Sequence, residues 1–300
     1  MRFLGVVHKN VRFYGTYYNL EPIDMAFASY ESILTYKESP PSPLIIMHGM
    51  LGSKTNWNSL CKAFQKRTNP QRKIIAVDAR NHGDSPHTAH HTYPHIAEDI
   101  KEFLTRQKIQ KACLLGHSMG GRAMMYFALK YPNFVDKLII EDMSPATTSP
   151  TLRKMPTLFM ALQNVKLPSN TPLSTARLNA DAQLAKSISD KGLRSFLLTN
   201  LTQKSDGSFV WRPNISVLVN NFTEHIATFP MTRNIFNGPV LFVAGGVSDF
   251  IQKSDDLIIK QLFPKSQMKV IDGAGHWLHS EKPNEFLQIC LEFLNEKSTD

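Results

Sequence analysis

Gly116-His117-Ser118-Met119-Gly120 is the stretch that decides the fold. A short apolar run at 112–115 precedes it, and apolar residues recur at three- and four-residue steps after it, from Ala123 to Tyr131. This order of strand, tight turn and helix is the context in which a G-x-S-x-G pentapeptide exposes a nucleophilic serine. We therefore predict a nucleophile elbow with Ser118 at its apex. The alternative is a Gly-rich turn whose serine only caps the helix.

The segments around this turn alternate between buried strands and helices. A continuous apolar run, such as 44–47 or 74–77, is typical of a strand that is buried on both faces. Weak alternation at 23–36 indicates a hairpin of edge strands. The pattern predicts an α/β fold with a mostly parallel, doubly wound sheet. Further strands are predicted at 112–115, 137–141, 240–244 and 268–271, and helices at 57–66, 96–104 and 286–294.

Residues 146–237 break this rhythm, because they contain helical patterns but no strong buried strand. Pro168 and Gly192 divide these patterns, and the segment is too long for a plain loop. We predict a helical cap that is inserted into a core formed by 21–145 and 238–300. Such a cap covers a pocket and selects the substrate.

The composition, with 42% hydrophobic and 20% charged residues in 300, is that of a globular protein. No run approaches the roughly 18 apolar residues of a membrane span. Cys61, Cys113 and Cys290 are widely spaced and odd in number, which favours a reducing compartment over secretion. No cysteine spacing indicates a metal site.

The formal net charge is +9. A basic protein of this kind favours anionic substrates or peripheral contact with an anionic membrane, unless its lysines are merely scattered. The sequence has no basic helical stripe with interleaved aromatic residues, so we expect no nucleic-acid partner.

Residues 1–20 form a candidate targeting segment. Arg2, Lys9 and Arg12 are basic, and no acidic residue occurs before Glu21. A basic, acid-free, amphipathic start predicts a mitochondrial location. The alternative is an ordinary basic tail on a cytoplasmic protein.

A serine nucleophile needs an oriented base, and His276 is the candidate. It lies in Gly273-Ala274-Gly275-His276-Trp277, directly after the last predicted strand. His48 and His117 are better interpreted as structural hydrogen-bonding groups, and we expect His279, three residues beyond His276, to lie at the start of a helix. A further cluster, which we interpret as a solvated polar loop rather than a metal site, contains His87, His90, His91 and His95.

The base needs a carboxylate at another strand end, and two aspartates qualify. Asp142 follows the predicted strand 137–141, and Asp249 follows the predicted strand 240–244. Asp78 and Asp84 come earlier, where we expect them to fix the Arg80-Asn81-His82 loop.

Acyl transfer also needs donors for the developing oxyanion. In this arrangement one donor is the backbone N–H after the nucleophile, here Met119, and the other follows an early strand, here Met50. Trp211, Phe222 and Phe159 are candidates for lining an acyl channel in the cap, with cap core as the alternative.

Five motifs carry a resemblance to a known family: His48-Gly49-Met50-Leu51-Gly52-Ser53-Lys54-Thr55-Asn56-Trp57, Val77-Asp78-Ala79-Arg80-Asn81-His82-Gly83-Asp84-Ser85-Pro86-His87, Gly116-His117-Ser118-Met119-Gly120-Gly121, Asp142-Met143-Ser144-Pro145 and Gly273-Ala274-Gly275-His276-Trp277. Together they closely resemble the alpha/beta-hydrolase domain-containing protein 11 family and bacterial esterases of the same type. The resemblance runs from about Leu44 to the C-terminus.

The resemblance implies a serine esterase or lipase-like hydrolase, mitochondrial in eukaryotes, which acts on acyl esters without a cofactor or metal. It also implies that Asp142 is the acid, because related esterases place the acid in this motif and a serine, matched by Ser248, after the next strand. Asp249 directly follows that serine, which keeps the second acid open.

Two other functions compete with a Ser-His-Asp ester or thioester hydrolase. One is a non-catalytic ligand-binding or complex-associated protein of the same fold. The other is a triad enzyme with C–C hydrolase or lyase chemistry. A complete set of nucleophile, base and acid argues against the first.

Overall fold

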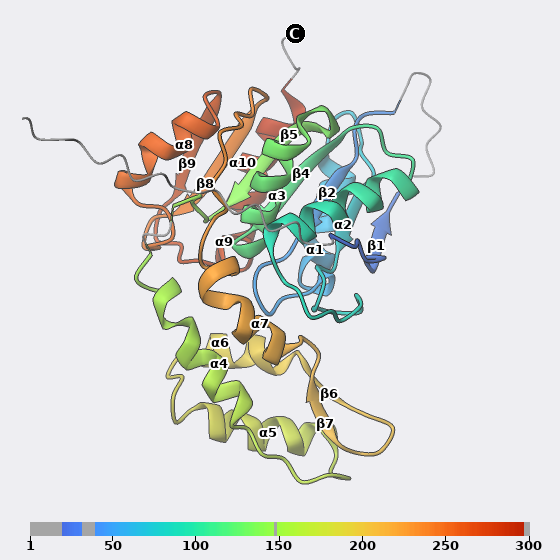
Figure 1. Cartoon of the computed structure of the whole chain (residues 1–300), viewed down its shortest axis with the longest axis vertical. Helices are drawn as coiled ribbons and strands as arrows, with labels where there is room; N and C mark the ends of the chain where they lie inside the picture. Colours follow the sequence, from blue (N-terminus) through green and yellow to red (C-terminus); the bar gives the residue numbers. More distant parts are fainter. Residues whose placement is uncertain (1–19, 32–39, 147–148, 297–300) are drawn as a thin grey trace, which may run out of the picture.

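A seven-stranded sheet with helices on both faces forms the larger part of the protein (Figure 1). The structure is a computed structural model, and it describes residues 20–31, 40–146 and 149–296. The strand order is β1-β3-β2-β4-β5-β8-β9, and every neighbouring pair is parallel except β1 and β3. The strands are β1 (Phe27–Tyr30), β2 (Leu44–Met47), β3 (Ile74–Val77), β4 (Ala112–His117), β5 (Val135–Glu141), β8 (Val240–Gly245) and β9 (Ser266–Ile271).

The central strands β2, β3 and β4 are buried along their whole length. Their sequences are continuous apolar runs because helices cover both faces of the sheet. Together with the parallel order of the strands, this confirms the predicted α/β class.

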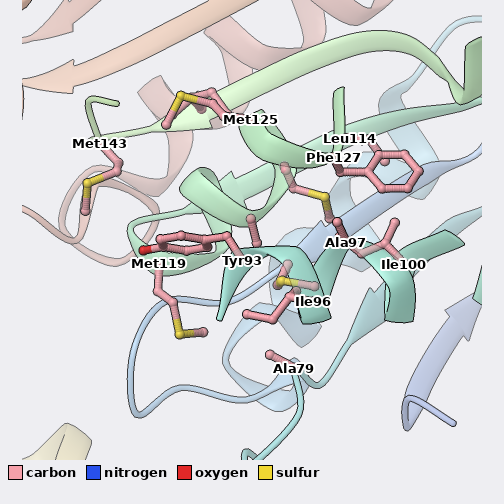
Figure 2. Close-up of a cluster of buried hydrophobic side chains, with 14 of the residues drawn as sticks. Ala79, Tyr93, Ile96, Ala97, Ile100, Leu114, Met119, Met125, Phe127 and Met143 are labelled. Atoms are coloured by element: carbon pink, nitrogen blue, oxygen red, sulfur yellow. The ribbon is translucent and has the colours of Figure 1, made fainter. Parts of the chain in front are cut away.

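Two hydrophobic cores lie on the two faces of the sheet. One face packs against α2 (Tyr93–Arg106), α3 (Met119–Lys130) and α8 (Asp256–Leu262). Figure 2 shows part of this core, with Phe127 beside Leu114 and with Ile96 closer to Tyr93. The other face packs against α1 (Asn58–Arg67) and α10 (Pro283–Asn295).

The three cysteines are buried and free. Cys61 and Cys290 belong to the core that contains α1 and α10, and Cys113 lies in β4. Burial raises the pKa of both Cys61 and Cys113 to about 12, so these thiols stay protonated and pack as apolar groups.

The segment between β5 and β8 lies apart from the sheet (Figure 1). Besides the predicted helical patterns, it contains a two-stranded hairpin, β6–β7, that the sequence did not predict. These strands have only three residues each, too few to show an alternating pattern. The elements are α4 (Met155–Gln163), α5 (Leu173–Leu184), α6 (Lys191–Leu198), β6 (Leu201–Gln203), β7 (Phe209–Trp211), α7 (Ile215–Asn221) and a π-helical turn (Phe222–Ile226).

Two predictions fall partly or wholly outside the described residues. The candidate targeting segment 1–20 lies outside the described residues except for its last residue. Within the expected edge hairpin at 23–36, the residues from 32 onward also lie outside them. The described strand β1 pairs with β3. None of the helices in the described part of the chain combines the length and the apolar character that crossing a bilayer requires.

Candidate active site

Ser118 occupies a strained turn between β4 and α3. Its backbone has φ 53° and ψ −116°, a region that non-glycine residues rarely adopt. The turn is tight: a side chain at Gly116 would place Cβ 2.3 Å from the carbonyl oxygen of Gly120. The Ser118 side chain makes no capping bond to α3, which argues against the capping alternative.

The register of the parallel strands brings Ser118 and Asp142 to the same edge of the sheet. His117 at the end of β4 lies opposite Glu141 at the end of β5. The residues that directly follow these two, Ser118 and Asp142, therefore leave the sheet side by side. The backbone N–H of Ser118 donates to the carbonyl of Glu141 at 3.1 Å. Adjacent strands therefore hold both residues at one level.

Asp142 is fully buried, and its carboxylate is held from three sides. Oδ2 lies 2.7 Å from Nδ1 of His276, and Oδ1 accepts the backbone N–H of Gly245 at 2.9 Å. The hydroxyl of Ser248 also donates to Oδ2. Because an ionised carboxylate only accepts, Nδ1 of His276 carries the proton and Nε2 is left as the basic atom.

The imidazole of His276 is also fixed in its plane. The ring of Phe250 stacks on it with centroids 3.6 Å apart and an angle of 14°. His276 and Ser118 line the same cavity. The structure thus brings the predicted nucleophile, base and one of the two acids to one place, and their catalytic roles remain predictions.

Asp249 has different partners. It accepts from the hydroxyl of Ser149 at 2.8 Å and from both the N–H and the hydroxyl of Thr151 at 2.9 Å. Burial raises the pKa of Asp249, but these hydrogen bonds outweigh burial, so the pKa lies below its usual value. Asp249 therefore ties the loop after β8 to the start of the segment that contains α4 to α7.

The cavity at Ser118 has a volume of about 420 Å³ and lies between the sheet edge and the segment with α4 to α7. Met50 and Met119, which carry the predicted oxyanion donors, line it, and so do many apolar residues. These apolar residues include Leu152, Met155, Leu158, Ile188, Leu193, Phe196, Leu197, Phe222 and Ile226.

Trp211 does not line this cavity, which corrects the interpretation of this residue as a substrate contact. Its indole N–H donates to the carbonyl of Leu162 at 2.9 Å, and its ring packs in the core of the α4–α7 segment. Phe222 lines the cavity instead, with Phe159 packed edge-on against it. A one-dimensional pattern cannot separate these aromatic residues, because each is equally apolar.

Buried histidines support the loop that carries Met50. Nε2 of His82 accepts the backbone N–H of Leu51 at 3.1 Å, and Nε2 of His48 accepts that of Ala79 at 3.1 Å. Each ring uses Nδ1 toward a backbone carbonyl. Both rings are therefore neutral, and burial lowers the pKa of both, that of His82 most strongly.

The expectation of a solvated polar loop at the histidine cluster is wrong for two of its members. His91 and His95 are buried, whereas His87 and His90 are exposed. His91 contacts the sulfur of Met119 through Nε2 at 3.2 Å. His95 lies in the first turn of α2, which begins at Tyr93, and His91 lies two residues before that helix. Their burial results from the packing of α2 against the rest of the protein, which the composition of the loop does not indicate.

Asp78 and Asp84 fix the neighbouring loop as predicted. The ammonium group of Lys54 lies 2.5 Å from Asp78 and 2.6 Å from Asp84. Asp78 also accepts the backbone N–H of Asp84 at 2.8 Å. These contacts hold the chain after β3 against the chain after β2.

The sheet order, the serine turn and the segment inserted after β5 define an alpha/beta-hydrolase. The family described as alpha/beta hydrolase fold matches residues 42–283. The mouse protein named sn-1-specific diacylglycerol lipase ABHD11 is 41% identical over 251 residues, which cover 84% of this chain and 80% of that protein.

Two further comparisons support this relationship. Esterase YbfF of Escherichia coli is 35% identical, with 85% of this chain and 94% of that protein covered. A solved marine microorganism esterase is 35% identical, with a TM-score of 0.81 over 90% of this chain and 99% of that one. The chain therefore belongs to the alpha/beta-hydrolase family, within the group of the ABHD11 proteins.

Substitution of Asp142 and of Asp249, one at a time, tests which of them is the acid that supports His276. Asp142 uses one oxygen for the Gly245 N–H and the other for His276, and the amide of Asp142→Asn has only one oxygen. With that oxygen on Gly245, its NH₂ group faces His276 and no longer holds the Nδ1–H tautomer, so we expect kcat to fall by about 10³–10⁴-fold. Asp249→Asn is the matched control, with kcat expected within about threefold of wild type because its partners lie elsewhere. Ester hydrolysis by both purified variants measures the difference, and the reverse ranking would assign the acid to Asp249.

Acidic conditions are expected to destabilise the protein through its buried histidines. Burial lowers the pKa of His91 to about 3, from an ordinary value of 6.5. Between these two pH values the unfolded chain binds a proton that the folded chain excludes, so the free energy of unfolding falls by ~1.4 kcal/mol per pH unit for this group. In urea titrations between pH 6.5 and 4, the free energy of unfolding of His91→Phe should therefore fall less steeply with decreasing pH than that of wild type, by ~1.4 kcal/mol per pH unit. An unchanged slope would contradict the assignment.

Proposed function

We propose that the protein hydrolyses acyl esters through Ser118, His276 and Asp142, with a fatty acyl chain held in the 420 Å³ cavity. The chain is an ester-hydrolysing enzyme of the serine hydrolase class, as its family and its lipase and esterase relatives show. The observation that carries the residue assignment is the 2.7 Å contact between Asp142 and His276 beside Ser118.

In the first half of the reaction, Oγ of Ser118 attacks the ester carbonyl while Nε2 of His276 takes the hydroxyl proton. Asp142 holds the imidazole and stabilises its positive charge. The oxyanion accepts hydrogen bonds from the backbone N–H groups of Met50 and Met119. Collapse of this intermediate breaks the bond to the alcohol, which leaves with the proton from His276.

In the second half, His276 removes a proton from water, and the resulting hydroxide attacks the acyl-enzyme carbonyl. The second tetrahedral intermediate releases the carboxylic acid, and Ser118 regains its proton from His276. All protons are returned, so the cycle restores Ser118, His276 and Asp142 to their starting states.

The shape and lining of the cavity support a lipid-like substrate. A volume of 420 Å³ is at the low end of the roughly 300–1,000 Å³ range of small-molecule sites, which suits one acyl chain better than two. The mouse relative is named for diacylglycerol, and we extend that substrate class to this protein. One acyl chain of a diacylglycerol would fill the cavity while the glycerol lies toward His276, which protonates it.

Fluorophosphonate labelling combined with an ester series tests this function. We expect wild type to be labelled, and both labelling and turnover to disappear in Ser118→Ala. In a p-nitrophenyl series, kcat/KM should rise by about fourfold per added methylene, from ~0.8 kcal/mol of burial, until the cavity is full. Phe222→Ala should shift the optimum toward longer chains. An unlabelled wild type, or no dependence on chain length, would contradict the proposal.

We also propose that the protein is mitochondrial and contacts anionic membrane there. Residues 1–20 carry basic residues without acids, and 146–237 contain ten basic and four acidic residues, a surplus of six (10 − 4) within the total of +9. Fractionation of cells that express a C-terminally tagged chain should place it with mitochondria. Part of it should pellet with membranes at low salt and be released at high salt. Detection of the tagged full-length chain in the cytosol alone would refute the location.

A further inference from the structure

A second set of polar side chains lies one residue before the proposed nucleophile and acid. His117 precedes Ser118, Glu141 precedes Asp142, and the two earlier residues are register partners at the ends of β4 and β5. The proposed triad mechanism uses neither of them. Both are buried, although a polar group is costly to bury unless it has partners.

Glu141 holds the chain shortly after the base. Its Oε1 accepts the backbone N–H of His279 at 2.9 Å and lies 2.7 Å from Nδ1 of the same residue. Because the carboxylate accepts both bonds, His279 is fixed in both its backbone and its ring. Trp57 stacks on the ring of His279, with centroids 4.4 Å apart and an angle of 17°.

His117 holds the base itself. Its Nε2 lies 2.9 Å from the backbone carbonyl oxygen of His276, and since a carbonyl only accepts, Nε2 is the donor. The ring centroid of His117 lies 4.7 Å from that of His276 and 4.9 Å from that of His279. Burial lowers the pKa of His117 well below its usual value, so the ring stays a neutral donor.

The same three residues have ligand atoms within 4.8 Å of one another, a spacing that would also suit a metal ion. The hydrogen bonds favour a hydrogen-bonded network over a metal site. The His279–Glu141 distance of 2.7 Å and the His117–His276 distance of 2.9 Å are those of direct hydrogen bonds. Oε1 of Glu141, Nδ1 of His279 and Nε2 of His117 are therefore already used in hydrogen bonds, whereas the buried Oε2 of Glu141 has no hydrogen-bond partner among the residues that the structure describes.

We propose that His117, Glu141 and His279 form a positioning network that fixes the backbone of His276 and so aims its imidazole at Ser118. This proposal rests on the role of His276 in the proposed function. His117 holds residue 276, and Glu141 holds residue 279, which leaves the intervening chain little freedom. Displacement of a reacting group by about 1 Å can cost 10²-fold in rate, so such anchoring has a direct catalytic value.

Two substitutions of Glu141 test the network. Glu141→Gln keeps an amide oxygen that can accept both bonds from His279, and kcat should stay within about threefold of wild type. Glu141→Leu removes the acceptor, so the chain at 276–279 should relax and kcat should fall by at least about tenfold, with KM within about twofold. Cys61→Ala, an equally buried change on α1, is the control and should leave kcat unchanged.

A spectroscopic measurement separates positioning from general destabilisation. The proton shared by His276 Nδ1 and Asp142 should give a far-downfield proton resonance in wild type and in Glu141→Gln. It should shift or broaden in folded Glu141→Leu. His117→Phe, which removes only the donor to the His276 carbonyl, provides a second variant with the same expected loss of kcat should Glu141→Leu not fold.

The outcomes distinguish this proposal from the proposed function. If wild type hydrolyses esters and His276→Ala does not, the function stands. In that case a folded Glu141→Leu or His117→Phe with wild-type kcat and an unshifted resonance would overturn the network. If Glu141→Leu and Cys61→Ala lose activity equally, the effect is general destabilisation and the network is also refuted. If His276→Ala is as active as wild type, the function itself fails.

Discussion

The active site depends on the register between three parallel strands. Pairing of β4 with β5 places the residues after both strands side by side, and pairing of β5 with β8 brings Gly245 within 2.9 Å of the Asp142 carboxylate. A shift of one residue along either strand would turn every side chain to the opposite face and remove these contacts. The continuous apolar strands that fill the sheet therefore also set the positions of the polar residues at its edge.

Most of the fold could be predicted because its signals are local. The buried runs gave the central strands, and the small residues around Ser118 gave the turn, since only glycine fits within 2.3 Å of the facing backbone. Other features depend on packing that no local pattern contains. The hairpin β6–β7 is too short to show alternation. Trp211 and Phe222 are both large and apolar, yet only Phe222 lines the cavity, whereas Trp211 bonds Leu162.

The two candidate acids show the same limit. Asp142 and Asp249 each follow a strand and could not be separated by position alone. In three dimensions Asp142 begins the loop immediately at the strand end and is fully buried against His276, whereas Asp249 lies four residues beyond β8 and bonds Ser149 and Thr151. The physical difference is therefore the distance from the sheet edge.

The helix α3, which begins directly after Ser118, also holds the segment that covers the cavity. Arg122, one turn later, is buried and donates from Nε to the carbonyl of Ser144 at 3.0 Å, where the chain leaves the sheet. Its Nη1 donates to the carbonyl of Ala227 at 2.7 Å, where the π-helical turn ends. One guanidinium thus joins both ends of the inserted segment to the helix that follows Ser118. Because Arg122 also lines the cavity, the position of the cavity wall is coupled to that of Ser118 through the single helix α3.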